Sequence, residues 1–183
     1  GRMFACEWAD ILPDFMCLSK GITSGYLPLA LTLTTERIYK AFYADFGLRK
    51  TFYHGHTYTA NPLSCSASLA SLEIFEEEQT LEKVKKLIPL FENSLKKFMN
   101  LDLTGDVRSI GLIGAIELVK NKATKQKFDY KERIGLEVYK RGLKKNLILR
   151  PLGSIIYLFL PLCIKENELE DVLDRTYSVI KSL

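Results

Sequence analysis

Lys20 follows a short apolar run and is flanked by glycine, with Gly21 directly after it and Gly25 close behind. The run Phe15–Leu18 predicts a buried strand that delivers Lys20 to a flexible turn. Burial at such a place favours the neutral amine, which can form a Schiff base with a carbonyl compound. The alternative is an exposed turn lysine, which is the commoner environment of lysine side chains.

The segment His54-Gly55-His56-Thr57 is a second candidate. If it is extended, both imidazoles point to one face and could bind a metal ion, with Cys65 as a further ligand. Two histidines lack a convincing third ligand at metal spacing, so we expect no metal. In a second interpretation the segment binds a phosphate. Gly55 would let the backbone come close to the phosphate, Thr57 and backbone N–H groups would donate hydrogen bonds to it, and the start of the next helix would lie nearby. The third is a packed aromatic loop.

Arg150 is the third candidate, because it stands between the apolar run Leu147–Leu149 and the turn residues Pro151-Leu152-Gly153. An arginine on otherwise apolar surface needs an anionic partner. A substrate carboxylate held by the guanidinium fork would serve, and so would a structural ion pair with one of the many acids of the chain.

Several elements must position these residues. Asn61-Pro62 predicts a helix start, because the asparagine side chain can cap free N–H groups and proline is tolerated in the first helical turn. We expect a domain boundary near Gln79 or within the following helix, and we divide the chain into residues 1–80 and 81–183. The expected strands are Leu29–Thr35, Val107–Ile110, Leu112–Val119, Leu147–Leu149 and Ile155–Leu160, and the expected helices are Glu36–Tyr43, Asn61–Glu77, Leu81–Phe98, Lys131–Lys144 and Glu166–Ile180.

The composition excludes several classes of protein. The net charge of +4 comes from scattered lysines and arginines, with no basic tract of the kind that nucleic-acid binding proteins carry. The most apolar stretch, residues 147–164, contains an arginine and two prolines, so we expect no membrane span. The cysteines form no C-x-x-C pair, which favours reduced thiols and a cytoplasmic protein; they are Cys6, Cys17, Cys65 and Cys163.

Four segments in order carry a resemblance to a known family: CLSKGITSGYLPLALTLTT, HGHTYTANPLSCSASLASLEIFE, DVRSIGLIGAIEL and ILRPLGSIIYLFLPL. Together they resemble the class III aminotransferases over essentially the whole chain, and four ordered motifs are far more specific than one. The resemblance implies an α/β fold, that of a fold-type I pyridoxal-phosphate-dependent transferase. Residues 1–80 would be the C-terminal part of the large α/β domain, and residues 81–183 the C-terminal α+β small domain.

The resemblance also implies a role for each candidate residue. Lys20 would be the Schiff-base lysine of pyridoxal 5'-phosphate and would carry the proton between substrate and cofactor. His56, through its backbone N–H, and Thr57 would bind the cofactor phosphate of the neighbouring subunit in a homodimer. Gly55 would contact substrate, and Arg150 would bind the carboxylate of a long-chain keto substrate.

Within the family, the segments FACEWADILPD and RPLGSIIYL resemble the biotin-pathway members. That implies conversion of 8-amino-7-oxononanoate to 7,8-diaminononanoate, with S-adenosylmethionine or lysine as amino donor. The alternatives are an ornithine or 4-aminobutyrate transaminase, or a non-catalytic fragment. The family's carboxylate for the pyridine nitrogen, its Gly-rich phosphate turn and its ring-stacking aromatic residue would all precede Gly1. We therefore expect the isolated chain to bind cofactor poorly and to be inactive.

Overall fold

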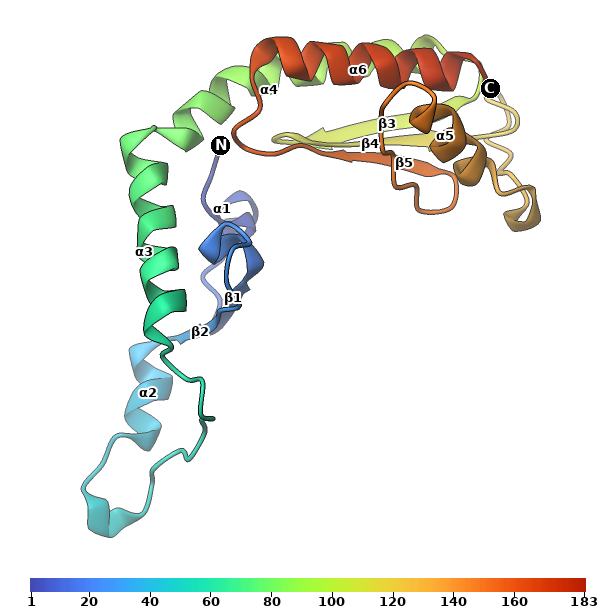
Figure 1. The fold of residues 1–183 in the computed structure, drawn as a ribbon. Helices are drawn as coiled ribbons and strands as arrows, with labels where there is room; N and C mark the ends of the chain where they lie inside the picture. The colour runs from blue at the N-terminus through green and yellow to red at the C-terminus, as the bar shows by residue number, and fades with distance from the viewer. The chain divides into compact units, whose positions relative to one another are not determined.

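The computed structural model describes all residues from Gly1 to Leu183, and the chain divides into two compact units (Figure 1). Residues Arg2–Thr80 form one unit, called here the lysine unit because it contains Lys20. Residues Leu81–Leu183, together with Gly1, form the other, called here the sheet unit. That these units are the end of a large domain and a small domain stays a prediction.

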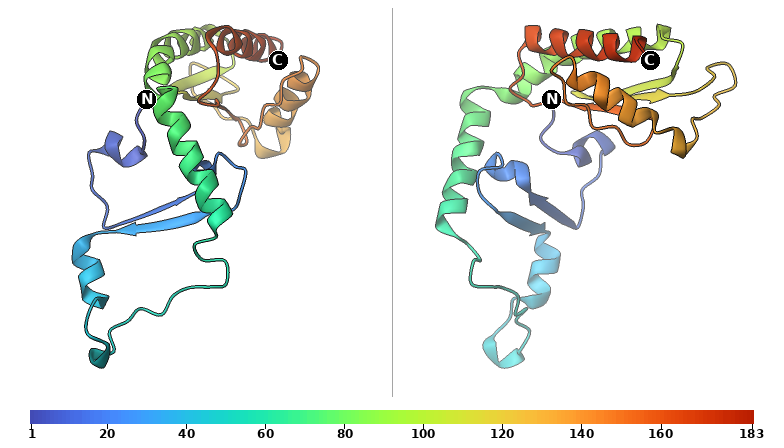
Figure 2. Two further views of the ribbon diagram at one scale, coloured as in Figure 1. Left: turned by 60° about the vertical axis from the view of Figure 1, so that its left-hand side comes forward. Right: turned by 45° about the vertical axis from the view of Figure 1, so that its right-hand side comes forward.

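The lysine unit is built around a two-stranded antiparallel sheet and one long helix. Strand β1 pairs with β2 so that Phe15 lies opposite Thr34 and Ser19 opposite Ala30, as the adjacent arrows in Figure 2 show. The elements in order are α1 (Ala5–Ala9), β1 (Phe15–Ser19), the 3-10 turn η1 (Lys20–Thr23), β2 (Ala30–Thr34), α2 (Glu36–Phe42), the 3-10 turn η2 (Phe46–Leu48) and α3 (Pro62–Glu77).

Helix α3 begins where the sequence predicts. The side chain of Asn61 accepts hydrogen bonds from the backbone N–H groups of Leu63 at 3.0 Å and Ser64 at 3.2 Å, so it caps two donors that the helix leaves free. Pro62 occupies the first turn, where its missing N–H costs nothing. The predicted helix Asn61–Glu77 is thereby confirmed.

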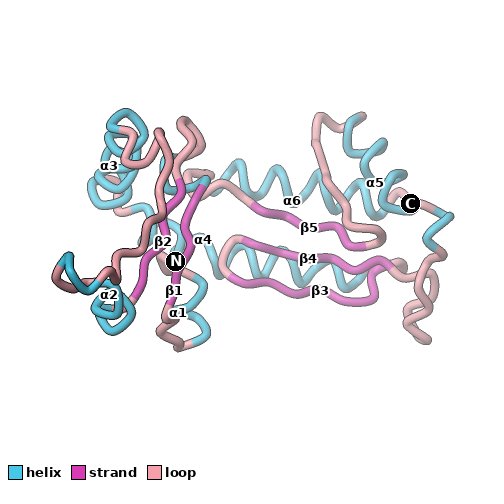
Figure 3. The backbone as a smooth tube through the Cα atoms, turned by 90° about the horizontal axis from the view of Figure 1, so that it is seen from below, coloured by secondary structure: helices cyan, strands magenta, loops and turns pink.

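The sheet unit has a three-stranded antiparallel sheet in the order β3-β4-β5. Two long helices, α4 and α6, lie along one face of this sheet, and Figure 3 shows them behind the strands. The elements in order are α4 (Thr80–Lys96), the 3-10 turn η3 (Lys97–Asn100), β3 (Thr104–Ile110), β4 (Ile113–Leu118), the 3-10 turn η4 (Tyr130–Glu132), α5 (Ile134–Leu143), β5 (Ile155–Phe159) and α6 (Glu166–Lys181).

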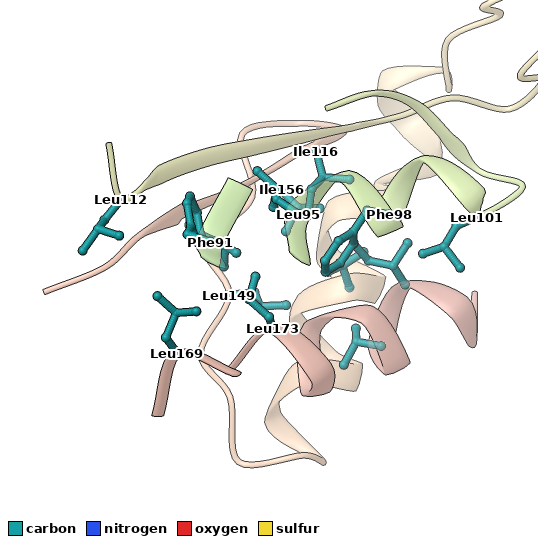
Figure 4. Close-up of a cluster of buried hydrophobic side chains, with 14 of the residues drawn as sticks. Phe91, Leu95, Phe98, Leu101, Leu112, Ile116, Leu149, Ile156, Leu169 and Leu173 are labelled. Carbon is teal, nitrogen blue, oxygen red and sulfur yellow. The ribbon is translucent and has the colours of Figure 1, made fainter. Parts of the chain in front are cut away.

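The hydrophobic core of the sheet unit lies between these helices and the sheet (Figure 4). Phe91 and Leu95 of α4 are at most 1% exposed and meet Gly114 of β4, where an added Cβ would come within 2.8 Å of both side chains. A glycine at this position therefore lets the helix pack directly on the sheet. Further buried members come from strands β4 and β5 and from helix α6: Ile116, Leu118, Ile156, Leu158, Leu169 and Leu173.

Two expectations about strands were wrong, and the start of one helix differs from the expected one. Residues 147–149 form no strand, because the backbone N–H of Leu147 donates to the carbonyl of Gly142 at the end of α5 and the segment follows that helix end. Strand β1 is not buried: Phe15 is 57% exposed, since the two-stranded sheet has no layer of this chain over its outer face. Helix α5 also begins at Ile134, later than expected, after a 3-10 turn.

None of the helices combines the length and the apolar composition needed to cross a membrane.

Candidate functional site

Lys20 lies at the junction of β1 and the turn η1, with its backbone in a left-handed conformation. Its φ is +55°, a region that residues other than glycine seldom adopt. The turn is closed by two backbone hydrogen bonds, from Gly25 N–H to the Lys20 carbonyl at 3.3 Å and from Ser24 N–H to the Gly21 carbonyl at 3.0 Å. An unusual backbone conformation held by surrounding contacts is a frequent property of functional residues.

Buried hydroxyl groups fix this turn to its surroundings. Thr23 is 1% exposed, and its hydroxyl donates to the carbonyl of Leu27 at 2.6 Å. The hydroxyls of Ser24 and Ser71 are 2.7 Å apart, which joins η1 to the middle of α3. Ser71 is 5% exposed, whereas Ser24 lies at the surface. The turn that carries Lys20 is therefore anchored to a helix that is itself capped.

A cavity of about 1200 Å³ adjoins this turn within the lysine unit. Lys20, Gly55 and His56 all line it, so the structure brings three of the five predicted site residues together. The Lys20 side chain is exposed, which was the alternative to burial, and it has no hydrogen-bond or ion-pair partner in the chain. Two other lining residues, Tyr26 and Ser64, were not predicted as site residues.

Thr57 does not line this cavity. Neither its N–H nor its hydroxyl has a partner in the chain, so both donors are available. The backbone N–H of His56, by contrast, already donates to the Thr59 hydroxyl at 3.0 Å, and its Nδ1 accepts from the Tyr58 N–H at 3.1 Å. Thr57 is the member of the pair whose donors are free for a ligand.

The metal interpretation finds no support in the geometry. No group of three His, Cys, Asp or Glu side chains in residues 1–183 is placed to hold a metal ion. The His54 ring stacks against Phe52 with centroids 5.6 Å apart, which is a packing role.

Arg150 belongs to the sheet unit and lines a separate cavity of about 610 Å³. Its side chain is exposed and forms no ion pair, although a structural ion pair was one of the two expected outcomes. The adjacent turn lies directly on α5, because a Cβ on Gly135 would come within 2.2 Å of the Gly153 carbonyl oxygen and 2.9 Å of the Pro151 ring. A glycine at position 135 is thus what allows the Arg150 turn to pack there.

A second arginine, Arg133, lines the same cavity and was missed in the sequence. It is the residue before α5, its φ is +49°, and its side chain has no partner in the chain. The expected helix Lys131–Lys144 includes this position, so the sequence offered no hint of a left-handed conformation there.

The acids around this cavity are engaged elsewhere. Glu117 lies 3.3 Å from Arg108, and Asp106 lies 2.6 Å from the same guanidinium. The hydrogen bond that Arg108 donates to Asp106, and then the one that it donates to Glu117, raise the pKa of Arg108. Asp129 accepts from the Lys131 N–H at 2.8 Å. The three cations that line the cavity, Lys127, Arg133 and Arg150, form no ion pair in the chain.

Comparison with known proteins shows which family and which enzymes this chain is similar to. A family model described as aminotransferase class-III matches residues 1–180. The adenosylmethionine-8-amino-7-oxononanoate aminotransferase of Aquifex aeolicus is 51% identical over 183 residues, which is 100% of this chain and 40% of that protein. The chain thus spans about 40% of the length of the curated relatives it matches.

Solved structures show the same relationship. A crystal structure of adenosylmethionine-8-amino-7-oxononanoate aminotransferase from Methanocaldococcus jannaschii has a TM-score of 0.92 and 46% identity, covering 99% of this chain and 42% of that one. A PLP-bound aminotransferase mutant from Vibrio fluvialis has a TM-score of 0.92 at 26% identity, covering 99% of this chain and 40% of that one. These matches confirm the expected α/β fold, that of part of a fold-type I pyridoxal-phosphate-dependent transferase.

Proposed function

The chain belongs to the class-III aminotransferase family, and from this premise we propose that it forms part of an enzyme that transfers an amino group to 8-amino-7-oxononanoate. Pyridoxal 5'-phosphate would be attached at Lys20. The observation that carries this proposal is the placement of Lys20, whose free amine lines one cavity with Gly55 and His56 on a turn anchored by buried hydroxyls.

The residues present fit one end of such a cofactor. A free primary amine faces the cavity from Lys20, and the wall beside it is largely apolar, formed by residues 26–31. No aspartate or glutamate lines this cavity, so the carboxylate that keeps a pyridine nitrogen protonated has to come from outside these residues.

The positions of Lys20 and Gly55 indicate what each would do beside the cofactor. Pyridoxal phosphate, when bound, supplies a carbonyl carbon for amines and a ring that withdraws electrons. The Lys20 amine lies at a strand end on a fixed turn, where it can carry a proton to and from a carbon held in the cavity. Gly55 presents bare backbone to the cavity, which leaves room for a substrate chain.

We propose that the enzyme is a homodimer in which Thr57 binds the cofactor phosphate of the partner subunit. Thr57 has free N–H and hydroxyl donors but does not line the cavity of its own Lys20, and both facts support a ligand at another Lys20. His56 would join it once its N–H leaves the Thr59 hydroxyl.

We propose that Arg150 binds the carboxylate of the keto substrate, because Arg150 lines a cavity with apolar walls and its guanidinium has no partner in the chain. S-adenosylmethionine, named in the description of the relatives, is the proposed amino donor. The four free cysteines fit a reducing compartment, and we place the enzyme in the cytoplasm.

Borohydride trapping tests the assignment of Lys20. The full-length protein would be incubated with pyridoxal phosphate, reduced and digested, and the cofactor mass located by peptide mapping. We expect the label on Lys20, its loss in Lys20→Ala, and its retention in the control Lys40→Ala, whose lysine lies 3.5 Å from Glu36 on α2. A label on any other lysine contradicts the assignment.

Product analysis tests the substrate. The full-length protein would be given 8-amino-7-oxononanoate with S-adenosylmethionine, lysine, ornithine or 4-aminobutyrate, and products followed by mass. We expect 7,8-diaminononanoate with S-adenosylmethionine as donor. Turnover of ornithine or 4-aminobutyrate without formation of that diamine would assign the enzyme to another branch of the family.

A further inference from the structure

We propose that Arg133 is a second carboxylate-binding residue beside Arg150, and that the pair selects substrates that end in a carboxylate on an aliphatic chain. This inference rests on the proposed function, because it names a further specificity residue for the same substrate. Both arginines line the 610 Å³ cavity of the sheet unit, and neither has a partner within the chain.

The structure holds Arg133 in place through the turn that precedes it. The Asp129 carboxylate accepts from the Lys131 N–H at 2.8 Å, and the Glu132 carboxylate accepts from the Asp129 N–H at 2.8 Å. Lys120 adds an ion pair to Glu132 at 3.2 Å. These contacts fix the 3-10 turn η4, and the residue after it, Arg133, enters α5 with φ +49° and ψ +39°.

A left-handed arginine at a helix start is an unfavourable choice for stability alone. Glycine or asparagine adopts that conformation at lower cost, and neither the capping box nor the ion pair of η4 uses the Arg133 side chain. The guanidinium therefore has no structural role in the sheet unit that the contacts reveal. Its one distinguishing property is that it faces the cavity of Arg150.

The charges around the cavity favour an anion. Lys127, Arg133 and Arg150 face it with no carboxylate bound to any of them. Of the two acids in its wall, Glu117 lies 3.3 Å from Arg108, and Asp129 is taken by a backbone N–H. Three cations therefore line this cavity against two carboxylates, and an anion would neutralise the excess positive charge.

The rest of the wall indicates which anion. It is mainly apolar, with Phe128, Ile134, Leu149 and Leu152 among the lining side chains, and such a wall suits methylene groups better than an inorganic phosphate. A carboxylate at the end of an aliphatic chain satisfies both the arginines and the apolar wall. The keto substrate proposed above belongs to that class.

Steady-state kinetics on the full-length protein test this role. Arg133→Asn removes the charge and keeps a residue that tolerates the left-handed backbone, and Arg133→Lys keeps a point charge without the fork. For Arg133→Asn we expect the KM for 8-amino-7-oxononanoate to rise about tenfold with kcat within about twofold, and a smaller rise for Arg133→Lys. With the methyl ester of the substrate, which has no carboxylate, the KM should be the same in both variants and wild type.

Arg49→Asn is the matched control. Arg49 is also left-handed, with φ +51°, also lacks a partner, and lines neither cavity, so its variant should leave both KM values unchanged. An unchanged KM for the acid in Arg133→Asn overturns the inference, and so does an equal rise for acid and ester.

Chemical protection separates this inference from the proposed function. Phenylglyoxal modification of Arg133 and Arg150 would be followed by peptide mapping with and without nonanoate, with nonan-1-ol as the uncharged control. We expect nonanoate alone to slow modification of both arginines several-fold. Protection of both in a protein that does not transaminate the keto substrate would reject the proposed function and keep the carboxylate site. Protection of Arg150 alone would reject the role of Arg133.

Discussion

The lysine unit and the sheet unit differ in what they bury. In the sheet unit, large apolar side chains fill the space between helices and sheet, and Phe91, Leu169 and Val179 are completely buried. In the lysine unit every buried residue is a serine or threonine: Thr23, Ser64, Ser68 and Ser71. Its large apolar side chains are exposed, among them Tyr26 at 86% and Phe46 at 89%.

This difference shows that different interactions hold the two candidate sites in position. Arg133 and Arg150 belong to the sheet unit, which has its own hydrophobic core, so packing inside that unit sets their backbone positions. Lys20 lies on a turn held by hydroxyl hydrogen bonds, in a unit whose apolar surface faces outward. Extensive exposed apolar surface marks a region that other protein surfaces cover, which agrees with the proposed dimer.

Separating the two units should give the largest effect. Residues 81–183 produced alone should fold cooperatively, because their core is complete, whereas residues 2–80 produced alone should not, because they bury no large apolar side chain. Urea unfolding followed by circular dichroism, with amide NMR dispersion, would measure both. A sigmoidal transition in residues 2–80 would show that buried hydroxyl contacts suffice and would break the comparison.

A core substitution should give the next largest effect. Phe91→Ala in residues 81–183 should lower the free energy of unfolding by about 3–5 kcal/mol, because it leaves a cavity where a completely buried ring had been. Phe159→Ala is the matched control, since that ring is 71% exposed, and its effect should be about 0.5 kcal/mol or less. Urea denaturation would measure the difference, and equal effects would mean that the core is elsewhere.

The sequence allowed much of the fold to be predicted, because periodic patterns and caps act locally. The three- and four-residue spacing around Phe91 and Leu95 predicted α4, and the Asn61 cap predicted the start of α3. The prediction of a strand over Leu147–Leu149 was wrong, because the Leu147 N–H bonds back to Gly142 in a local turn that ends α5, and an apolar run alone does not show such a turn. The prediction that β1 is buried was also wrong. An apolar strand sequence does not show whether another part of the same chain covers the strand.

The candidate site was predictable only in part. Ordered motifs led to Lys20, Gly55 and Arg150, and the structure places the first two on one cavity. The occupied N–H of His56 depends on the local fold of residues 56–59, and the place of Arg133 depends on a left-handed backbone. Neither feature has a sequence pattern of its own.

Gly135→Ala should give a smaller effect that connects stability with the Arg150 cavity. The added Cβ would meet the Gly153 carbonyl oxygen at 2.2 Å, so the Arg150 turn must shift, and the free energy of unfolding should fall by about 1–3 kcal/mol. Urea denaturation of residues 81–183 would measure it. Lys140→Ala, at an exposed position of the same helix, should change stability little. A neutral Gly135→Ala would mean that the turn is not packed on α5.

The smallest expected effect is in the acid range, at the turn before Arg133. A hydrogen bond from the Asp129 N–H, and then the Lys120 ion pair, lower the pKa of Glu132 below its ordinary value of 4.5. A carboxyl with a lowered pKa stabilises the folded state above its unfolded pKa, and this contribution is lost as the pH falls through the folded value. In residues 81–183, Glu132→Gln should therefore make the free energy of unfolding fall less steeply below pH 4.5, as measured by urea unfolding at several pH values.

NMR of the carboxyl groups should show that the pKa of Glu132 lies below 4.5. The substitution Lys120→Met should raise this pKa only part of the way to 4.5, because the hydrogen bond from the Asp129 N–H is the larger cause of its lowering. Full return to 4.5 in Lys120→Met would mean that the ion pair, and not the capped turn, orders the approach to Arg133.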